Sequence, residues 1–112
     1  MARRSPMQEP FQRITVQQAK EMFDRGTAQL IDVREKKEWD QGHIKGAVLI
    51  PVNDILARIK EVAADRDVIF HCAMGVRSAL ACEMAAAMGR GRLYNMEGGM
   101  DAWRALHYPV EK

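Results

Sequence analysis

The order of apolar and polar residues along the chain predicts short buried strands that alternate with helices. Four short, mainly apolar runs have the length and composition of short strands. These runs are 28–33, 47–50, 68–71 and 93–95. Pro51 closes the second run, and the turn residues Asp65, Arg66 and Asp67 precede the third. The third run does not alternate in polarity, which predicts a central position in a sheet.

Helical periodicity occupies the segments between these runs. Thr15 and Gln18 form a capping-box pattern, and apolar residues then recur at helical spacing until Gly26. The other predicted helices are residues 35–41, a segment capped by Asn53, residues 78–88, and a short final helix after Gly98 and Gly99.

Two of these helices carry apolar faces that are predicted to pack on the sheet. The helix capped by Asn53 has four apolar residues on one face: Ile55, Leu56, Ile59 and Val62. The alanine-rich helix 78–88 has a stripe of larger residues at i, i+4 and i+8: Leu80, Met84 and Met88.

Strands and helices in alternation with short connections indicate a mainly parallel sheet with helices on both faces. The expected architecture is therefore a three-layer α/β/α domain. Ligands of such sheets bind outside the carboxyl ends of the strands. Cys72 follows the run 68–71 directly and falls at one of these ends.

Cys72 begins a short loop that leads from a strand into a helix. Gly75 allows the tight backbone turn. The N–H groups of such a loop, together with the positive end of the following helix, favour an anion at their centre. A cysteine after a buried strand is often only a small core residue, and the loop is what favours reactivity. Cys72 is therefore the candidate nucleophile, expected to be ionised and open to small molecules.

Composition limits the chain to one soluble domain. Its 112 residues, 47% hydrophobic and 29% charged, suffice for one core, and no apolar run has the length of a membrane-spanning helix. A net charge of +2 is too balanced to indicate nucleic acid, but it suits a small anionic substrate. Residues 1–12 lack a signal-peptide core, which predicts a flexible N-terminal segment, a domain at 13–112 and a cytoplasmic location.

The cysteines and histidines do not indicate a metal or a disulfide. Cys72 and Cys82 match neither a CxxC pair nor a zinc-ligand spacing, and His43, His71 and His107 are scattered. We therefore predict neither a metal nor a structural disulfide. Cys82 lies inside the alanine-rich helix and is expected to be inert.

Three segments of the chain carry a pattern that is specific in combination. The first is Leu30 to Glu35 with Glu38 and Trp39, the second is Gly42 to Ala47, and the third is Cys72 to Ser78 with Glu97-Gly98-Gly99 and Trp103. Together they resemble a single-domain rhodanese, a member of the sulfurtransferase superfamily. The resemblance covers nearly the whole domain. It implies a five-stranded parallel sheet flanked by helices, with the active-site loop after the fourth strand.

The resemblance also implies an activity that needs no cofactor. Cys72 would take a sulfane sulfur from a donor such as thiosulfate and pass it from a persulfide to cyanide or to a thiol, including a protein thiol. The substrate-binding residues would be those of the loop: Ala73, Met74, Gly75, Val76 and Arg77. Their N–H groups would surround the persulfide, and the Arg77 side chain would favour the dianion thiosulfate. Neither nucleic acid nor a membrane is expected as a partner.

Two other functions remain open. The fold also resembles the catalytic domain of cell-cycle dual-specificity phosphatases, which leaves a phosphatase or an arsenate-type reductase. The loop from Cys72 to Arg77 has six residues, one fewer than the phosphatase loop, and this favours sulfur over phosphate. The other alternative is a binding or sulfur-relay module that accepts persulfide only from a partner protein.

Four side chains outside the nucleophile receive supporting roles. Asp32 interrupts an apolar strand and needs a partner such as Arg34, a backbone N–H or a basic group at the loop. Glu38 and His43 are assigned to local hydrogen bonding, because sulfur transfer from an ionised thiol requires little proton transfer. Met74 is expected at the rim of the pocket, where its apolar side chain would exclude water.

Overall fold

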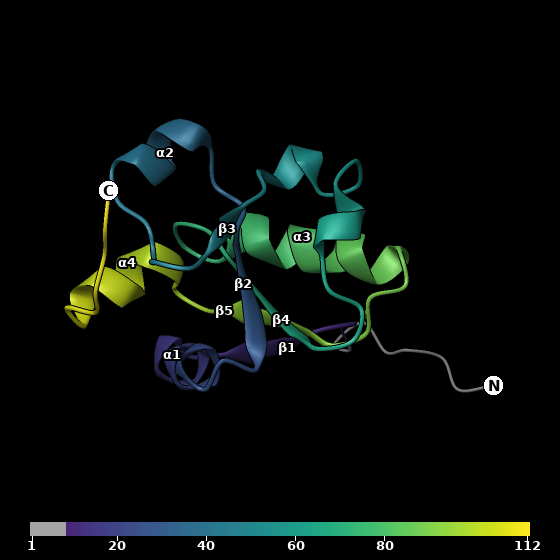
Figure 1. The fold of residues 1–112 in the computed structure, drawn as a ribbon, viewed down its shortest axis with the longest axis horizontal. Helices are drawn as coiled ribbons and strands as arrows, with labels where there is room; N and C mark the ends of the chain where they lie inside the picture. The colour runs from purple at the N-terminus through teal and green to yellow at the C-terminus, as the bar shows by residue number, and fades with distance from the viewer. Residues whose placement is uncertain (1–8) are drawn as a thin grey trace.

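The computed structural model describes residues 9–112 and contains a five-stranded parallel sheet between layers of helices (Figure 1). The strands are β1 (Gln12–Ile14), β2 (Ala28–Asp32), β3 (Val48–Leu49), β4 (Asp67–His71) and β5 (Leu93–Met96). Their order in the sheet is β1-β5-β4-β2-β3, and every neighbouring pair is parallel. The expected α/β architecture is confirmed, with β4 in the centre and the cysteine loop after the fourth strand.

Within residues 9–112, the chain also forms four α-helices and two short 3₁₀ turns. They are α1 (Val16–Asp24), α2 (Lys36–Asp40), α3 (Val76–Ala87), α4 (Gly99–Ala105), η1 (Val52–Asp54) and η2 (Ile59–Glu61). The capping box of α1 forms as predicted, with hydrogen bonds from the Gln18 N–H to Thr15 Oγ1 and from the Thr15 N–H to Gln18 Oε1. None of the helices in this range is both long and apolar enough to cross a bilayer.

An apolar cluster lies between each face of the sheet and the helices that cover that face. On one face α3 and the 3₁₀ turns cover Ile31 and Phe70, and on the other α1 and α4 cover Ile69. Successive residues of a strand point to opposite faces. Cys72 therefore belongs to the cluster under α3, on the same face as Phe70, whereas His71 points to the opposite face.

Helix α3 differs from the prediction in its start and in its buried face. It begins at Val76, two residues before the predicted start, so Arg77 lies in its first turn. The buried residues are small: Ser78, Ala81, Cys82 and Ala85. Leu80 and Met88, in contrast, are 54% and 46% exposed, so the prediction that the whole stripe of larger residues packs on the sheet is wrong, and only Met84 of the stripe packs against the cluster under α3. Small side chains let the helix lie close to the sheet, and Leu80 and Met88 are left on the outside.

The segment after Asn53 is not a continuous helix. It consists of the turns η1 and η2, and Asn53 lies inside η1 rather than at a helix N-cap. Ile55 and Val62 are buried as predicted, but Leu56 is exposed. The segment connects the edge strand β3 to the central strand β4, and β2 lies between these two strands in the sheet.

Strand β1 was not predicted from the sequence. Residues 1–8 of the predicted flexible segment lie outside the described residues. Phe11 is buried under α3, and β1 pairs with β5 from Gln12 onward. Only Ile14 of its three residues is buried, so the strand has no apolar run that could reveal it.

A buried ion pair lies at the carboxyl end of β2. Asp32 is fully buried, and Arg34 donates from Nε to Oδ1 at 3.0 Å and from Nη2 to Oδ2 at 2.8 Å. Arg34 also donates to the Gly42 carbonyl at 2.8 Å, which ties the strand end to the segment after α2. His71 Nε2 lies 3.7 Å from Asp32 Oδ2, and burial lowers the pKa of His71 despite this carboxylate. Arg34 is thus the partner that Asp32 was expected to need.

Removing Arg34 should destabilise the domain strongly. In the Arg34→Met variant the Asp32 carboxylate stays buried without its partner, and we expect the free energy of unfolding to fall by about 3–5 kcal/mol. Urea titration measures this change. The matched control is Lys36→Met, which removes an exposed pair with Asp40 and should have little effect. Equal losses in the two variants would contradict the assignment.

Candidate active site

The loop after β4 places the Cys72 sulfur at the N-terminus of α3. Gly75 is the N-cap of this helix and has φ +107°, a left-handed conformation that favours glycine. Its N–H donates to Cys72 Sγ at 3.1 Å. The turn therefore directs a backbone donor at the sulfur, as the sequence predicted.

The surroundings of Cys72 favour its thiolate. Burial raises the pKa of the thiol, but hydrogen bonds from the Ser78 side chain and from the backbone N–H groups of Ser78, Gly75 and Met74 lower it further than burial raises it. The pKa of Cys72 is therefore below its ordinary value. Two of these amides lie in the predicted loop, whereas Ser78 was not predicted to contribute.

Ser78 connects the sulfur to a buried polar network. Its Oγ lies 3.4 Å from Cys72 Sγ and donates to Asn95 Oδ1. Asn95 Nδ2 donates to the Gly75 carbonyl at 3.1 Å and to Glu97, which fixes the orientation of the amide. A hydroxyl has one proton, so Ser78 must turn it from Asn95 to Cys72 to stabilise a thiolate. The sequence feature that could have predicted this role is the position of Ser78 in the first turn of the helix, where backbone N–H groups lack intrahelical partners.

Cys72 is covered in this structure. The residue is only 1% exposed, which corrects the expectation that the thiol is open to small molecules. The cause is the loop itself, because the amides that stabilise the sulfur fold directly over it. Met74 and Val76 are 68% and 77% exposed on the outside of this cover. A reagent must displace part of the cover to reach the sulfur.

Helix α4 holds the first two carbonyls of the loop. The Met100 N–H donates to the Cys72 carbonyl at 2.8 Å, and the Asp101 N–H donates to the Ala73 carbonyl at 3.0 Å. Gly99 has φ +54°, and a Cβ atom there would lie 2.3 Å from the Cys72 carbonyl oxygen and 2.6 Å from that of Ala73. Glycine at position 99 thus allows α4 to approach the loop closely.

Arg77 does not extend freely from the loop. It donates from Nη1 to Glu38 Oε1 at 2.7 Å and from Nη2 to Glu38 Oε2 at 2.9 Å. The Arg77 hydrogen bonds lower the pKa of Glu38 to about 2, and the same pair raises the pKa of Arg77. The charge of the nearby Cys72 thiolate also raises the pKa of Arg77. Glu38, predicted to make local contacts only, therefore also pairs with a residue of α3.

The remaining candidates lie apart from the sulfur. Cys82 is fully buried on the sheet side of α3, and burial raises the pKa of its thiol, as expected for an inert cysteine. Both cysteines are free thiols. His43 Nδ1 lies 3.0 Å from the Trp39 carbonyl oxygen, and its ring stacks on the Trp39 ring.

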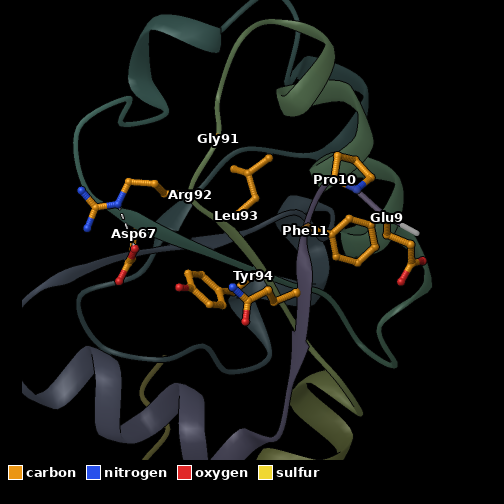
Figure 2. Close-up of a pocket in the computed structure, with 9 residues that line it drawn as sticks. Glu9, Pro10, Phe11, Asp67, Gly91, Arg92, Leu93 and Tyr94 are labelled. Carbon is orange, nitrogen blue, oxygen red and sulfur yellow. Dashed lines mark hydrogen bonds and ion pairs between the residues drawn. The ribbon is translucent and has the colours of Figure 1, made fainter. Parts of the chain in front are cut away.

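A pocket lies at the end of the sheet opposite Cys72 (Figure 2). It has a volume of about 430 Å³ and is lined by residues that include Phe11, Tyr94 and the Arg92–Asp67 pair. Asp67 is the first residue of β4, whereas Cys72 follows its last residue. This pocket contains no cysteine or histidine, and we assign it no part in the chemistry of Cys72.

The comparison with known families agrees with this geometry. The family model described as the rhodanese-like domain matches residues 15–106. The chain belongs to the rhodanese-like family. The resemblance drawn from the three sequence segments is thereby confirmed.

Similar proteins include named sulfurtransferases. A sulfurtransferase from Allochromatium vinosum is 38% identical over 81 residues, which cover 72% of this chain and 76% of that protein. The thiosulfate sulfurtransferase GlpE from Pseudomonas paraeruginosa is 30% identical over 105 residues, or 94% of each protein. The crystal structure of a rhodanese-related protein from Thermoplasma volcanium has a TM-score of 0.82 at 29% identity and covers 90% of this chain and 98% of its own.

Removal of the Ser78 hydroxyl from this rhodanese-like domain should raise the pKa of Cys72. In Ser78→Ala the thiolate loses a hydrogen-bond donor, and we expect the pKa of Cys72 to rise, since a hydrogen bond to a charged group contributes about 1.5–3 kcal/mol. The pH dependence of alkylation by iodoacetamide reports this value, because the thiolate is the reactive form. The midpoint of the alkylation profile should therefore move to higher pH in Ser78→Ala. An unchanged midpoint in Ser78→Ala would show that the hydroxyl does not act on the sulfur.

A methyl group at position 99 should disrupt the loop. In Gly99→Ala the new Cβ overlaps two loop carbonyls, and we expect the free energy of unfolding to fall by about 3 kcal/mol. Gly89→Ala is the matched control, because Gly89 also has positive φ, at +88°, but a Cβ atom there would meet nothing within 4 Å. Chemical denaturation of both variants separates the overlap from the strain of positive φ. Similar losses in both would exclude the overlap as the cause.

Proposed function

We propose that this rhodanese-like domain is a sulfurtransferase that moves a sulfane sulfur from thiosulfate or a similar donor to cyanide or a thiol. Cys72 is its nucleophile and carries the sulfur as a persulfide. The observation that carries the proposal is the position of the Cys72 sulfur, which receives the Gly75 N–H at 3.1 Å at the N-terminus of α3. The named sulfurtransferases among the similar proteins support sulfur rather than phosphate as the group transferred.

The proposed reaction has two steps. The Cys72 thiolate attacks the outer sulfur of thiosulfate, a new S–S bond forms, and sulfite leaves with the electron pair of the old bond. Cyanide then attacks the terminal sulfur of the persulfide, thiocyanate leaves, and the thiolate is regenerated. Neither step needs a proton transfer or an added oxidant. A lowered pKa of Cys72 serves both steps, because the thiolate is the attacking group in the first and the leaving group in the second.

The loop is the proposed binding site for the donor and the transferred sulfur. It comprises Ala73, Met74, Gly75, Val76 and Arg77. A persulfide places its outer sulfur about 2.05 Å from Cys72 Sγ, near the inner surface of this loop. The amides of Met74 and Gly75 already lower the pKa of Cys72 and would stabilise the persulfide anion in the same way. A free thiol of this kind suits a reducing compartment, so the proposal includes a cytoplasmic location.

One observation favours a second candidate function, that of a sulfur-relay module. Cys72 is covered, and the exposed side chains of Met74 and Val76 form an apolar rim outside it. A partner protein that binds this rim would displace the cover and deliver or remove the sulfur directly. In that case the domain would form a persulfide but turn over slowly with small donors.

The test compares wild type, Cys72→Ser and Cys82→Ala. We expect thiosulfate-dependent formation of thiocyanate by wild type and Cys82→Ala, and at least a roughly 1000-fold loss in Cys72→Ser, on the order expected when a nucleophile is removed. Mass spectrometry after incubation with thiosulfate should show a reducible gain of one sulfur on Cys72. Equal thiocyanate formation by wild type and Cys72→Ser would reject the proposal. Persulfide formation without thiocyanate would identify the relay function.

A further inference from the structure

The cationic group next to the nucleophile is neutralised by a residue from another helix. The Glu38 carboxylate of α2 accepts hydrogen bonds from both terminal nitrogens of Arg77 in α3, with N···O distances of 2.7 and 2.9 Å. The Arg77 and Glu38 side chains are 35% and 29% exposed, so solvent screens their charges only partly. An anionic donor that approaches Cys72 therefore meets an ion pair rather than a free guanidinium.

The backbone holds the Glu38 carboxylate in this position. Glu38 Oε1, which accepts from Arg77, also accepts the Glu35 N–H at 3.1 Å at the start of α2. This second hydrogen bond belongs to the capping box of α2. Because of it, the carboxylate is kept beside Arg77 and does not simply turn to solvent when another anion arrives.

A bound oxyanion and the Glu38 carboxylate compete for the same N–H groups of Arg77. The fork of an arginine binds a carboxylate or another oxyanion through the same pair of nitrogens. The competition matters most for a sulfur donor with two negative charges. Glu38 repels such a donor, and it also neutralises the Arg77 guanidinium that would attract it. This changes the expectation that Arg77 makes thiosulfate the preferred donor.

We propose that Glu38 is a specificity-determining residue, whose carboxylate holds Arg77 and disfavours doubly charged sulfur donors relative to singly charged ones. The inference rests on the proposed sulfur transfer by Cys72 and names the donor class of that site. Glu38 touches no reacting atom and acts through Arg77.

The informative variant is Glu38→Gln. Glutamine keeps an amide oxygen that can accept the Glu35 N–H, so the cap of α2 is retained while the negative charge is removed. The matched control is Glu61→Gln. Glu61 forms an equally short pair with Arg58, at 2.7 and 2.9 Å, and its carbonyl accepts from Gln29 near the start of β2, at the end of the sheet opposite Cys72.

Two donors with the same reacting sulfur isolate the effect of charge. Thiosulfate has two negative charges and releases sulfite, whereas methanethiosulfonate has one and releases methanesulfinate when the Cys72 thiolate takes its outer sulfur. In Glu38→Gln we expect the KM for thiosulfate to fall about fivefold and that for methanethiosulfonate by about twofold or less, with kcat little changed. Glu61→Gln should change neither KM. An equal change for both donors, or a higher KM for thiosulfate, would overturn the proposal.

A second measurement needs no turnover and separates this proposal from the proposed function. Iodoacetate is an anion and iodoacetamide is neutral, and both alkylate the same thiolate, so the ratio of their rates at Cys72 reports the local charge. Glu38→Gln should raise this ratio about twofold, the effect expected for one negative charge, and Glu61→Gln should leave it unchanged. A raised ratio without sulfur transfer would support the role of Glu38 and reject the proposed function. Sulfur transfer with an unchanged ratio would overturn the role of Glu38 alone.

Discussion

The structure of the site depends on the contact between the Gly75 N–H and the Cys72 sulfur. To bring this amide inward, the loop must turn its first carbonyls outward, and they need other hydrogen-bond partners. The N–H groups of Met100 and Asp101 in α4 supply them. The left-handed turn at Gly75 directs the amide at the sulfur, and glycine at position 99 lets α4 approach the loop carbonyls. Both glycines are therefore needed for the same loop conformation.

The same arrangement both activates the sulfur and limits access to it. Amides lower the pKa of a thiol only when they lie close to it, and a loop at that distance leaves almost none of Cys72 exposed. A more open loop would expose the sulfur but lose the hydrogen bonds that favour its thiolate. A reagent therefore needs the loop to be displaced to reach Cys72, and the lowered pKa of the thiol favours the thiolate that it would meet there.

The local sequence pattern predicted the strands that carry apolar runs. It also predicted the position of Cys72, because burial on both faces of the central strand demands continuous apolar residues up to the cysteine. The buried face of α3 could not be predicted by size, since close packing on the sheet selected small residues over Leu80. The pairing of Arg77 with Glu38 was also missed. The two residues are 39 positions apart, and only the tertiary fold brings α2 beside the start of α3.

Two arginine–carboxylate pairs near the carboxyl ends of the strands differ in exposure, and this difference separates their roles. The Asp32–Arg34 pair is buried, so loss of one partner leaves an unsolvated charge, at a cost of about 3–5 kcal/mol. Such a pair cannot exchange its partner during a reaction. The Glu38–Arg77 pair is about one-third exposed, and exchanging one anion for another there costs about 1 kcal/mol or less. Under the proposed function, a pair of this strength can open for an anionic sulfur donor and still influence which donor is bound.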